Sequence, residues 1–98
     1  MSYVCILQVD LHFPENGSLK GKRKDLVSVR TILAKRFGAS VAEVDHHDLW
    51  QRTAIAVAAV AGEQYHARRV LHEVEKLVDR WGEVELIERE LTLHYPEA

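Results

Sequence analysis

The spacing of the apolar residues alternates between two periods along this chain, and that order restricts the fold more than any other feature. From Tyr3 to Phe13 every second residue is apolar, which is typical of a half-buried strand. Apolar residues then recur at helical spacing from Leu19 to Phe37 and again from Ala67 to Trp81. Further strands are predicted at 40–46, 53–61 and 84–95. The sequence therefore predicts the order strand–helix–strand–strand–helix–strand.

Residues with turn or capping preferences separate these segments. Pro14 to Gly17 follows the first strand with turn chemistry, and Ser18 is a favourable N-cap for the first helix. Gly38 and Gly82 are placed where the two helices should end, and Gly62 opens the second helix. The last segment alternates less cleanly, which indicates an exposed edge strand or a bulge.

Two strand–helix–strand units joined by a hairpin define the ferredoxin-like plan, an α+β fold. Right-handed crossovers give one antiparallel sheet with the order 4-1-3-2 and place both helices on one face. The third strand is apolar on both of its faces, so it belongs in the middle of the sheet. A chain of 98 residues holds one hydrophobic core, so residues 1–98 are expected to form a single domain. No glycine-rich loop follows the first strand, which excludes a Rossmann-type nucleotide site.

The one cysteine and the lack of a leader-like segment indicate a cytoplasmic protein. Cys5 lies in the middle of the first strand, where a small buried hydrophobe is expected, and it cannot form an internal disulfide. The longest apolar run, Ala54–Ala61, is too short to span a bilayer. No contact with a membrane is therefore expected.

A net charge of −2 conceals a strong asymmetry along the chain. The segment 20–36 has Asp25 as its only acid, whereas the acids of 83–90 face only Arg89. A domain of this kind can bind an anion with one surface despite its acidic total. The cations of the basic segment are Lys20, Lys22, Arg23, Lys24, Arg30, Lys35 and Arg36.

The predicted topology brings the end of the first strand, the start of the first helix and the 46–52 hairpin to one end of the domain. A helix N-terminus with flanking cations is a natural phosphate site, and a tryptophan in the hairpin offers a surface for stacking a base. A solvated basic face is the alternative interpretation. The predicted anion- or nucleic-acid-binding residues are Ser18, Lys20, Lys22, Arg23, Lys24, Trp50 and Arg52.

A second group of polar residues at the same end suggests a metal or acid–base site. Its members are Asp10, His12, His46, His47 and Asp48. Neighbours on a strand point to opposite faces, and the first and second strands should lie roughly 10 Å apart with the third strand between them. No zinc-ligand spacing is present, so a structural role is favoured, with His12 bonding loop backbone. No serine or cysteine forms an activated pair with a histidine, so no catalytic residue, metal or cofactor is expected.

A ferredoxin-like sheet has one face that the helices do not cover. Val4 and Ile6 point to that face, and the third strand adds small apolar side chains to it. Apolar groups on an uncovered face tend to find a partner, so a homodimer through this face is expected.

Several segments, in order and with similar spacing, resemble the bacterial YlxP-like family (domain of unknown function 503). They are Leu11–Pro14, Ser18–Arg23, Ser40–Val44 and Asp48–Arg52. The resemblance implies a ferredoxin-like fold, a cytoplasmic bacterial protein and a link to translation or ribosome maturation, because such genes often lie beside translation-factor genes. It implies no reaction, since the family has no established activity.

Two residues depart from the family pattern, Gly21 where an acid is usual and His47 where glutamine is usual. Gly21 is the third helical position, where a glutamate would complete a capping box. The glycine removes a negative charge and should leave backbone N–H groups free for an anion.

These features predict a non-catalytic binding domain for RNA or a ribosomal partner. The alternative is a homodimeric protein-interaction module that does not bind nucleic acid, and a third option is a small enzyme that uses Asp10 and His12.

Overall fold

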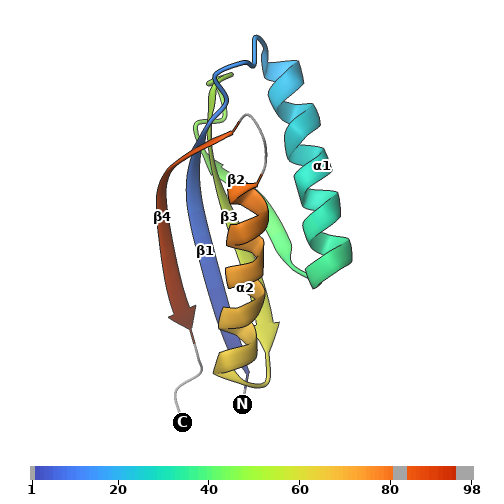
Figure 1. Ribbon diagram of the computed structural model, residues 1–98, viewed down its shortest axis with the longest axis vertical. Coiled ribbons are helices and arrows are strands. Elements are labelled where there is room, and N and C mark those ends of the chain that lie inside the picture. Colours follow the sequence, from blue (N-terminus) through green and yellow to red (C-terminus); the bar gives the residue numbers. More distant parts are fainter. Residues whose placement is uncertain (1, 81–83, 95–98) are drawn as a thin grey trace.

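The computed structural model describes residues 2–80 and 84–94, and its elements follow the predicted order (Figure 1). The elements are β1 (Tyr3–His12), α1 (Leu19–Phe37), β2 (Ser40–Asp45), β3 (Arg52–Ala61), α2 (Gln64–Asp79) and β4 (Glu85–His94). Among the described residues, no helix combines the length and the apolar content needed to cross a membrane.

The four strands form one sheet with the order β2-β3-β1-β4, and each neighbouring pair is antiparallel. This is the predicted order 4-1-3-2 read from the opposite edge. Both helices lie on one face of the sheet, as Figure 1 shows. α2 packs on β1 and β3, whereas α1 packs mainly on β2. No helix among the described residues covers the other face of the sheet, which is called the open face below.

The helix and strand ends follow local chemistry. The Ser18 side chain caps α1 by accepting a hydrogen bond from the Gly21 N–H at 3.0 Å, and Gly38 ends the helix with φ of 63°. β2 stops at Asp45, one residue before the predicted end, because His46 adopts a left-handed φ of 62°. The predicted ends of the second helix and the last strand lie outside the described residues.

The core is built from alternate residues of β1 and β3 and one stripe of each helix. Every second residue of β1 from Cys5 onward is buried because it faces the helices. The other core residues include Ile55, Val57, Ala67, Leu71, Val74, Val78, Val29 and Leu33.

The irregular alternation of β4 has a structural cause. The register between β1 and β4 shifts between Asp10 and Leu11, which leaves Ile87 as the extra residue of a bulge. Arg89 aligns with buried Val9, so it faces the helices, and its guanidinium forms an ion pair with Glu75 of α2. β4 is thus both an edge strand and a bulged one, as the pattern indicated.

The buried thiol of Cys5 gives a simple test of the core. Burial raises the pKa of this thiol, and the opposing effects of the Arg68 charge and a backbone hydrogen bond at Ile6 are smaller. The thiolate is the reactive form, so we expect the native protein to resist labelling by a disulfide reagent at mildly alkaline pH. Labelling should become fast and complete in denaturant. Rapid labelling of the native protein would show that the first strand is accessible.

Candidate functional site

The loop that follows β1 and the hairpin between β2 and β3 are joined at one end of the domain. The Phe13 N–H donates to the Gln51 carbonyl oxygen at 2.8 Å. The Gln51 side-chain amide donates to the carbonyl oxygens of Pro14 and Asn16, at 3.3 and 3.2 Å. These bonds bring together two segments that hold five of the predicted site residues, which are Ser18, His46, His47, Asp48 and Trp50.

Asn16 connects this junction to the start of α1. Its side-chain N–H₂ donates to the Ser18 carbonyl oxygen at 2.7 Å and to the Trp50 carbonyl oxygen. A Cβ at position 21 would lie 2.3 Å from Asn16 Oδ1, so any other residue there would require the Asn16 side chain to move. Backbone N–H groups at the helix start were expected to be free, but the N–H of Gly21 is not one of them, because it donates to the Ser18 hydroxyl. The first turn of α1 nevertheless contains no acid.

Lys22 is buried, with only 1% of its surface exposed. Its ammonium donates to the carbonyl oxygens of His46, His47 and Arg52, at 2.8, 3.1 and 3.3 Å. It also lies 3.0 Å from Glu43 Oε2. The prediction that Lys22 contacts phosphate does not fit this geometry, because its donors are directed into the hairpin.

The helical spacing of α1 contains the signal that Lys22 points inward. Lys22 lies on the same stripe as Leu19, Leu26, Val29 and Leu33, which faces the sheet. A cation on an apolar stripe needs a buried partner, and β2 supplies it as Glu43.

Glu43 is held as a carboxylate by its neighbours. Burial by itself would raise its pKa, but hydrogen bonds from Thr53 and Lys22 and the nearby Lys22 charge outweigh that effect and lower the pKa. The Thr53 hydroxyl is buried and donates to Glu43 Oε2 at 2.5 Å. The Lys22–Glu43 pair therefore fixes α1, β2 and the hairpin to one another.

Arg52 lies on the opposite side of the sheet from α1. Its guanidinium donates to Asp10 Oδ1 at 2.9 Å, and it is paired in register with His12 on the open face. The structure thus separates Arg52 from the basic helix start with which it was grouped. Its role there is to balance the Asp10 charge.

His46, which follows the edge strand β2, also contacts the carboxylate of Asp10. Its Nε2 lies 3.4 Å from Asp10 Oδ2. The expectation that the first and second strands keep these groups apart is wrong for this pair. Ala54, which lies between Asp10 and Asp45 in the sheet, is small, and the left-handed turn and a register shift redirect the imidazole.

The remaining polar candidates do not form one centre. His12 Nδ1 lies 3.2 Å from Glu85 Oε2, where a bond to loop backbone was expected. His47 and Asp48 are exposed in the hairpin turn, and Lys22 binds the carbonyl oxygen of His47. Within residues 2–80 and 84–94, no three His, Cys, Asp or Glu side chains are arranged to hold a metal ion.

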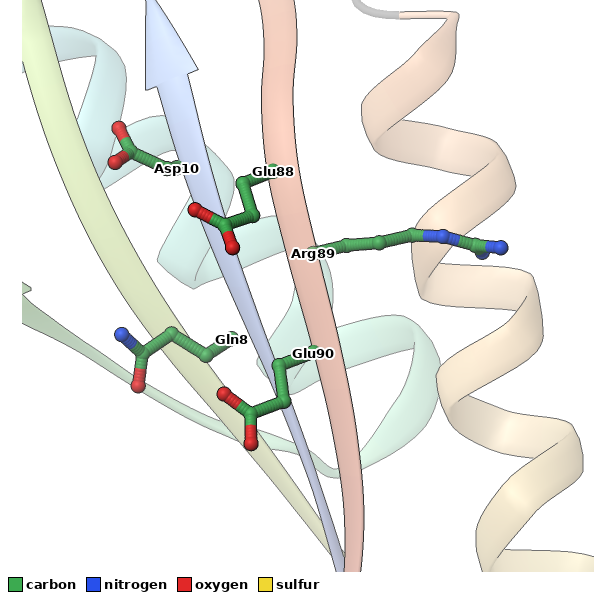
Figure 2. Close-up of a pocket in the computed structure, with 5 residues that line it drawn as sticks. All are labelled: Gln8, Asp10, Glu88, Arg89 and Glu90. Atoms are coloured by element: carbon green, nitrogen blue, oxygen red, sulfur yellow. The ribbon is translucent and has the colours of Figure 1, made fainter.

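The open face has an acidic hollow beside β4 that the sequence analysis did not find. Figure 2 shows Gln8, Asp10, Glu88 and Glu90 on the open side of β1 and β4, with Arg89 directed the other way toward α2. The hollow has a volume of about 120 Å³. The signal was present in the alternation of Glu88 and Glu90, which places both on one face of a strand.

The exposed side of α1 carries a row of cations. In the part of the chain that the structure describes, its cations have no acidic partner within ion-pair distance. Trp50 is 52% exposed, and its backbone lies beside the helix start through Asn16. We call this surface the α1 basic face; it consists of Lys20, Arg23, Lys24, Arg30 and Lys35.

The order of the elements and of the strands defines this protein as a ferredoxin-like α+β domain. Its polar candidate residues gather at the end of the domain that contains the β2–β3 hairpin. A family model described as "Protein of unknown function (DUF503)" matches residues 4–91, and the chain belongs to this family. It is 35% identical over 69 residues to the uncharacterized protein YlxP of Bacillus subtilis (strain 168). The matched segment covers 70% of this chain and 75% of the Bacillus protein.

Solved structures with a similar arrangement have low sequence identity. The de novo designed protein Ferredog-Diesel has a TM-score of 0.46 at 17% identity, covering 94% of this chain and 84% of that one. SnoaB, a cofactor-independent oxygenase from Streptomyces nogalater, has a TM-score of 0.49 at 14% identity, covering 99% of this chain and 94% of that one.

Proposed function

We propose that this domain binds structured RNA through the α1 basic face and Trp50. The observation that carries the proposal is a row of exposed cations that form no ion pair with any acid among the described residues. Trp50, which is 52% exposed, lies in the hairpin that Asn16 joins to the start of the same helix. A cation that already has a carboxylate partner must break that ion pair to bind phosphate. The cations of the α1 basic face have no such pair to break within the described residues. The surface is therefore ready to accept a phosphate backbone.

The spacing on α1 suits a run of phosphates. Lys20, Arg23 and Lys24 lie within the first two turns, so their side chains occupy neighbouring positions of one helix surface. The absence of acid in the first turn leaves the positive end of the helix dipole uncompensated. Lys22 contributes indirectly, because it holds the hairpin that presents Trp50.

The open sheet face is a poorer RNA surface than α1. In ferredoxin-like RNA-binding modules, bases stack on aromatic side chains of the sheet. The open-face residues of β1 and β3 here include no Phe, Tyr or Trp, and β4 adds Glu88 and Glu90, which repel phosphate. The helix side is thus the better candidate.

The sequence resemblance to YlxP-like proteins implies a link to translation, so we propose ribosomal RNA in the cytoplasm as the ligand to test first. A labelled ribosomal RNA hairpin and a single-stranded RNA should be titrated at two salt concentrations. We expect binding that weakens steeply with salt, with a slope of about −0.7 to −0.9 per phosphate contact. Lys20→Ala/Arg23→Ala/Lys24→Ala should weaken binding roughly tenfold or more and flatten that slope.

A matched control removes the same number of cations from α2. Arg68→Ala/Arg69→Ala/Lys76→Ala changes the net charge equally, so a surface-specific site predicts little loss with this variant. Trp50→Ala should cost about 1–3 kcal/mol on RNA with unpaired bases and less on a duplex. Equal losses with both triple variants, or no binding at low salt, would refute the proposed site.

A further inference from the structure

A shallow groove lies between α2 and β4 on the helix side of the sheet, and we call it the α2–β4 groove. It has a volume of about 640 Å³ and is lined by Tyr65, Arg68, Arg69, His72, Glu73 and Leu91. α2 packs mainly on β1 and β3, so it leaves part of β4 uncovered. Leu91 aligns with buried Leu7 and therefore faces the helices, yet 44% of its surface is exposed. The groove is separate from the α1 basic face, because α2 lies between β4 and α1 (Figure 1).

β4 also offers backbone hydrogen-bonding groups along this groove. Among the described strands it pairs only with β1, so it is an edge of the sheet. From Glu88 to His94 the register with β1 runs without a shift. In a regular antiparallel strand, alternate residues direct both their N–H and their C=O groups away from the neighbouring strand. An extended peptide can therefore add to this segment as a fifth strand.

Arg68 is directed toward β4 by its position on the helix. It lies seven residues, about two turns, before Glu75, so the two side chains project from the same side of α2. Glu75 forms an ion pair with Arg89 of β4, which shows that this side of the helix faces the edge strand. His72 lies about one turn after Arg68 and continues the same row. The helix thus presents an arginine and a histidine to the groove.

The arginines of the groove have no acid that compensates their charge. With its amide oxygen toward Arg68, Gln64 accepts from Nε and Nη2 at 3.1 and 3.3 Å, which holds the guanidinium in place without neutralising it. Glu73, the acid that lines the groove, lies 3.4 Å from the ammonium of Lys76. Among the described residues, no carboxylate lies within ion-pair distance of Arg68 or Arg69. An incoming carboxylate therefore has no ion pair to displace at either arginine.

The open-face side of β4 has the opposite charge. Glu88 and Glu90 alternate with the helix-facing residues of the strand, and neither forms an ion pair within the part of the chain that the structure describes. A strand paired with β4 would direct its side chains alternately to the cationic side and to the acidic side. Opposite charges on neighbouring strands attract, so acidic residues fit beside Arg68 and basic residues fit beside the two glutamates.

We infer that the α2–β4 groove binds an extended peptide in which acidic residues alternate with basic ones, added to β4 as a fifth strand. The peptide backbone pairs with the outward-directed groups of β4, and its acidic side chains reach the arginines of α2. A second copy of this chain fits less well. Its β4 would bring Arg89 and leucines to the cationic side, and its β2 would bring Glu43, which Lys22 already binds. The inference does not depend on RNA binding by the α1 basic face.

Fluorescence anisotropy with a labelled synthetic peptide tests this inference. The probe repeats Lys-Glu four times, and a control peptide places the same lysines and glutamates in two blocks. We expect the alternating peptide to bind roughly tenfold more tightly, because only it can direct every acid to one side of a strand. Arg68→Ala should weaken its binding roughly tenfold through the loss of a charge-assisted hydrogen bond. Arg36→Ala is the matched control, because Arg36 is an exposed arginine near the end of α1 and its loss should leave the affinity unchanged.

Amide hydrogen exchange distinguishes strand addition from simple attraction between charges. With the alternating peptide bound, alternate amides of residues 88–94 should exchange more slowly. Glu88→Gln/Glu90→Gln should also weaken the binding, and circular dichroism should show this variant and Arg68→Ala folded, since the replaced side chains are exposed. Equal binding of the two peptides, an unchanged affinity in both variants, or no slowing of exchange along β4 would overturn the inference. So would displacement of the peptide by an RNA hairpin, which would assign the groove to nucleic acid.

Discussion

Replacing Lys22 with methionine is expected to lower the free energy of unfolding by about 3–5 kcal/mol. Methionine keeps much of the volume of the side chain but removes its charge. Glu43 would then be a largely buried carboxylate without its cation, and the carbonyl oxygens of His46, His47 and Arg52 would lose a common donor. Leaving buried polar groups unpaired costs more than the net gain of the original bonds.

Urea denaturation of Lys22→Met against Lys24→Met measures this effect. Lys24 is an exposed cation two residues away, so its replacement should change the stability by less than about 0.5 kcal/mol. The double variant Lys22→Met/Glu43→Gln should recover part of the loss, because it removes the unpaired charge as well. A loss below about 1 kcal/mol in Lys22→Met would show that the ammonium does not hold the hairpin.

The order of elements and the sheet topology could be predicted because they rest on local signals. Alternating residues in Tyr3–Phe13 and the capping residues Ser18 and Gly38 act within a few positions of the chain. Right-handed crossovers then leave one arrangement of the strands. The bulge in β4 was indicated by Arg89, which alternates in step with the apolar residues of that segment. The ion-pair partner of Arg89, Glu75 of α2, could not be predicted in this way.

The candidate site was predicted less well, because its geometry depends on contacts between distant segments. Lys22 and Arg52 both belonged to the predicted cationic group, yet each is paired with an acid that lies far from it in sequence. The sheet register determines that Arg52 faces Asp10, and a left-handed turn determines that His46 does too. Neither the Arg52–Asp10 contact nor the His46–Asp10 contact can be predicted from the composition or the spacing of a single segment.

The buried pair also links stability to the proposed binding surface. Lys22 lies between Lys20 and Arg23 in sequence, whose side chains stay in solvent, and its own ammonium holds the hairpin that contains Trp50. A buried charge pair adds little net stability compared with an apolar pair of similar size. Its value here is that it fixes one position of the hairpin relative to α1, which an apolar contact would specify less precisely.

Glu43 should make this junction sensitive to acid. Its pKa is lowered in the folded protein relative to about 4.3 in the unfolded chain. A carboxyl with a lowered folded pKa contributes stability that is fully present above the unfolded value and is lost as the pH falls through the folded value. The Glu43→Gln variant lacks this contribution, so it should be less stable than the wild type by roughly 1–3 kcal/mol at neutral pH.

The difference between wild type and Glu43→Gln should therefore shrink as the pH falls below about 4, since the wild-type carboxyl becomes protonated too. Urea denaturation across a series of pH values measures it. Glu73→Gln is the matched control, because Glu73 is an exposed carboxyl paired with Lys76 on α2 and should show little difference at any pH. A stability difference in Glu43→Gln that is constant with pH, or that grows in acid, would mean that the carboxylate form of Glu43 does not stabilise the junction.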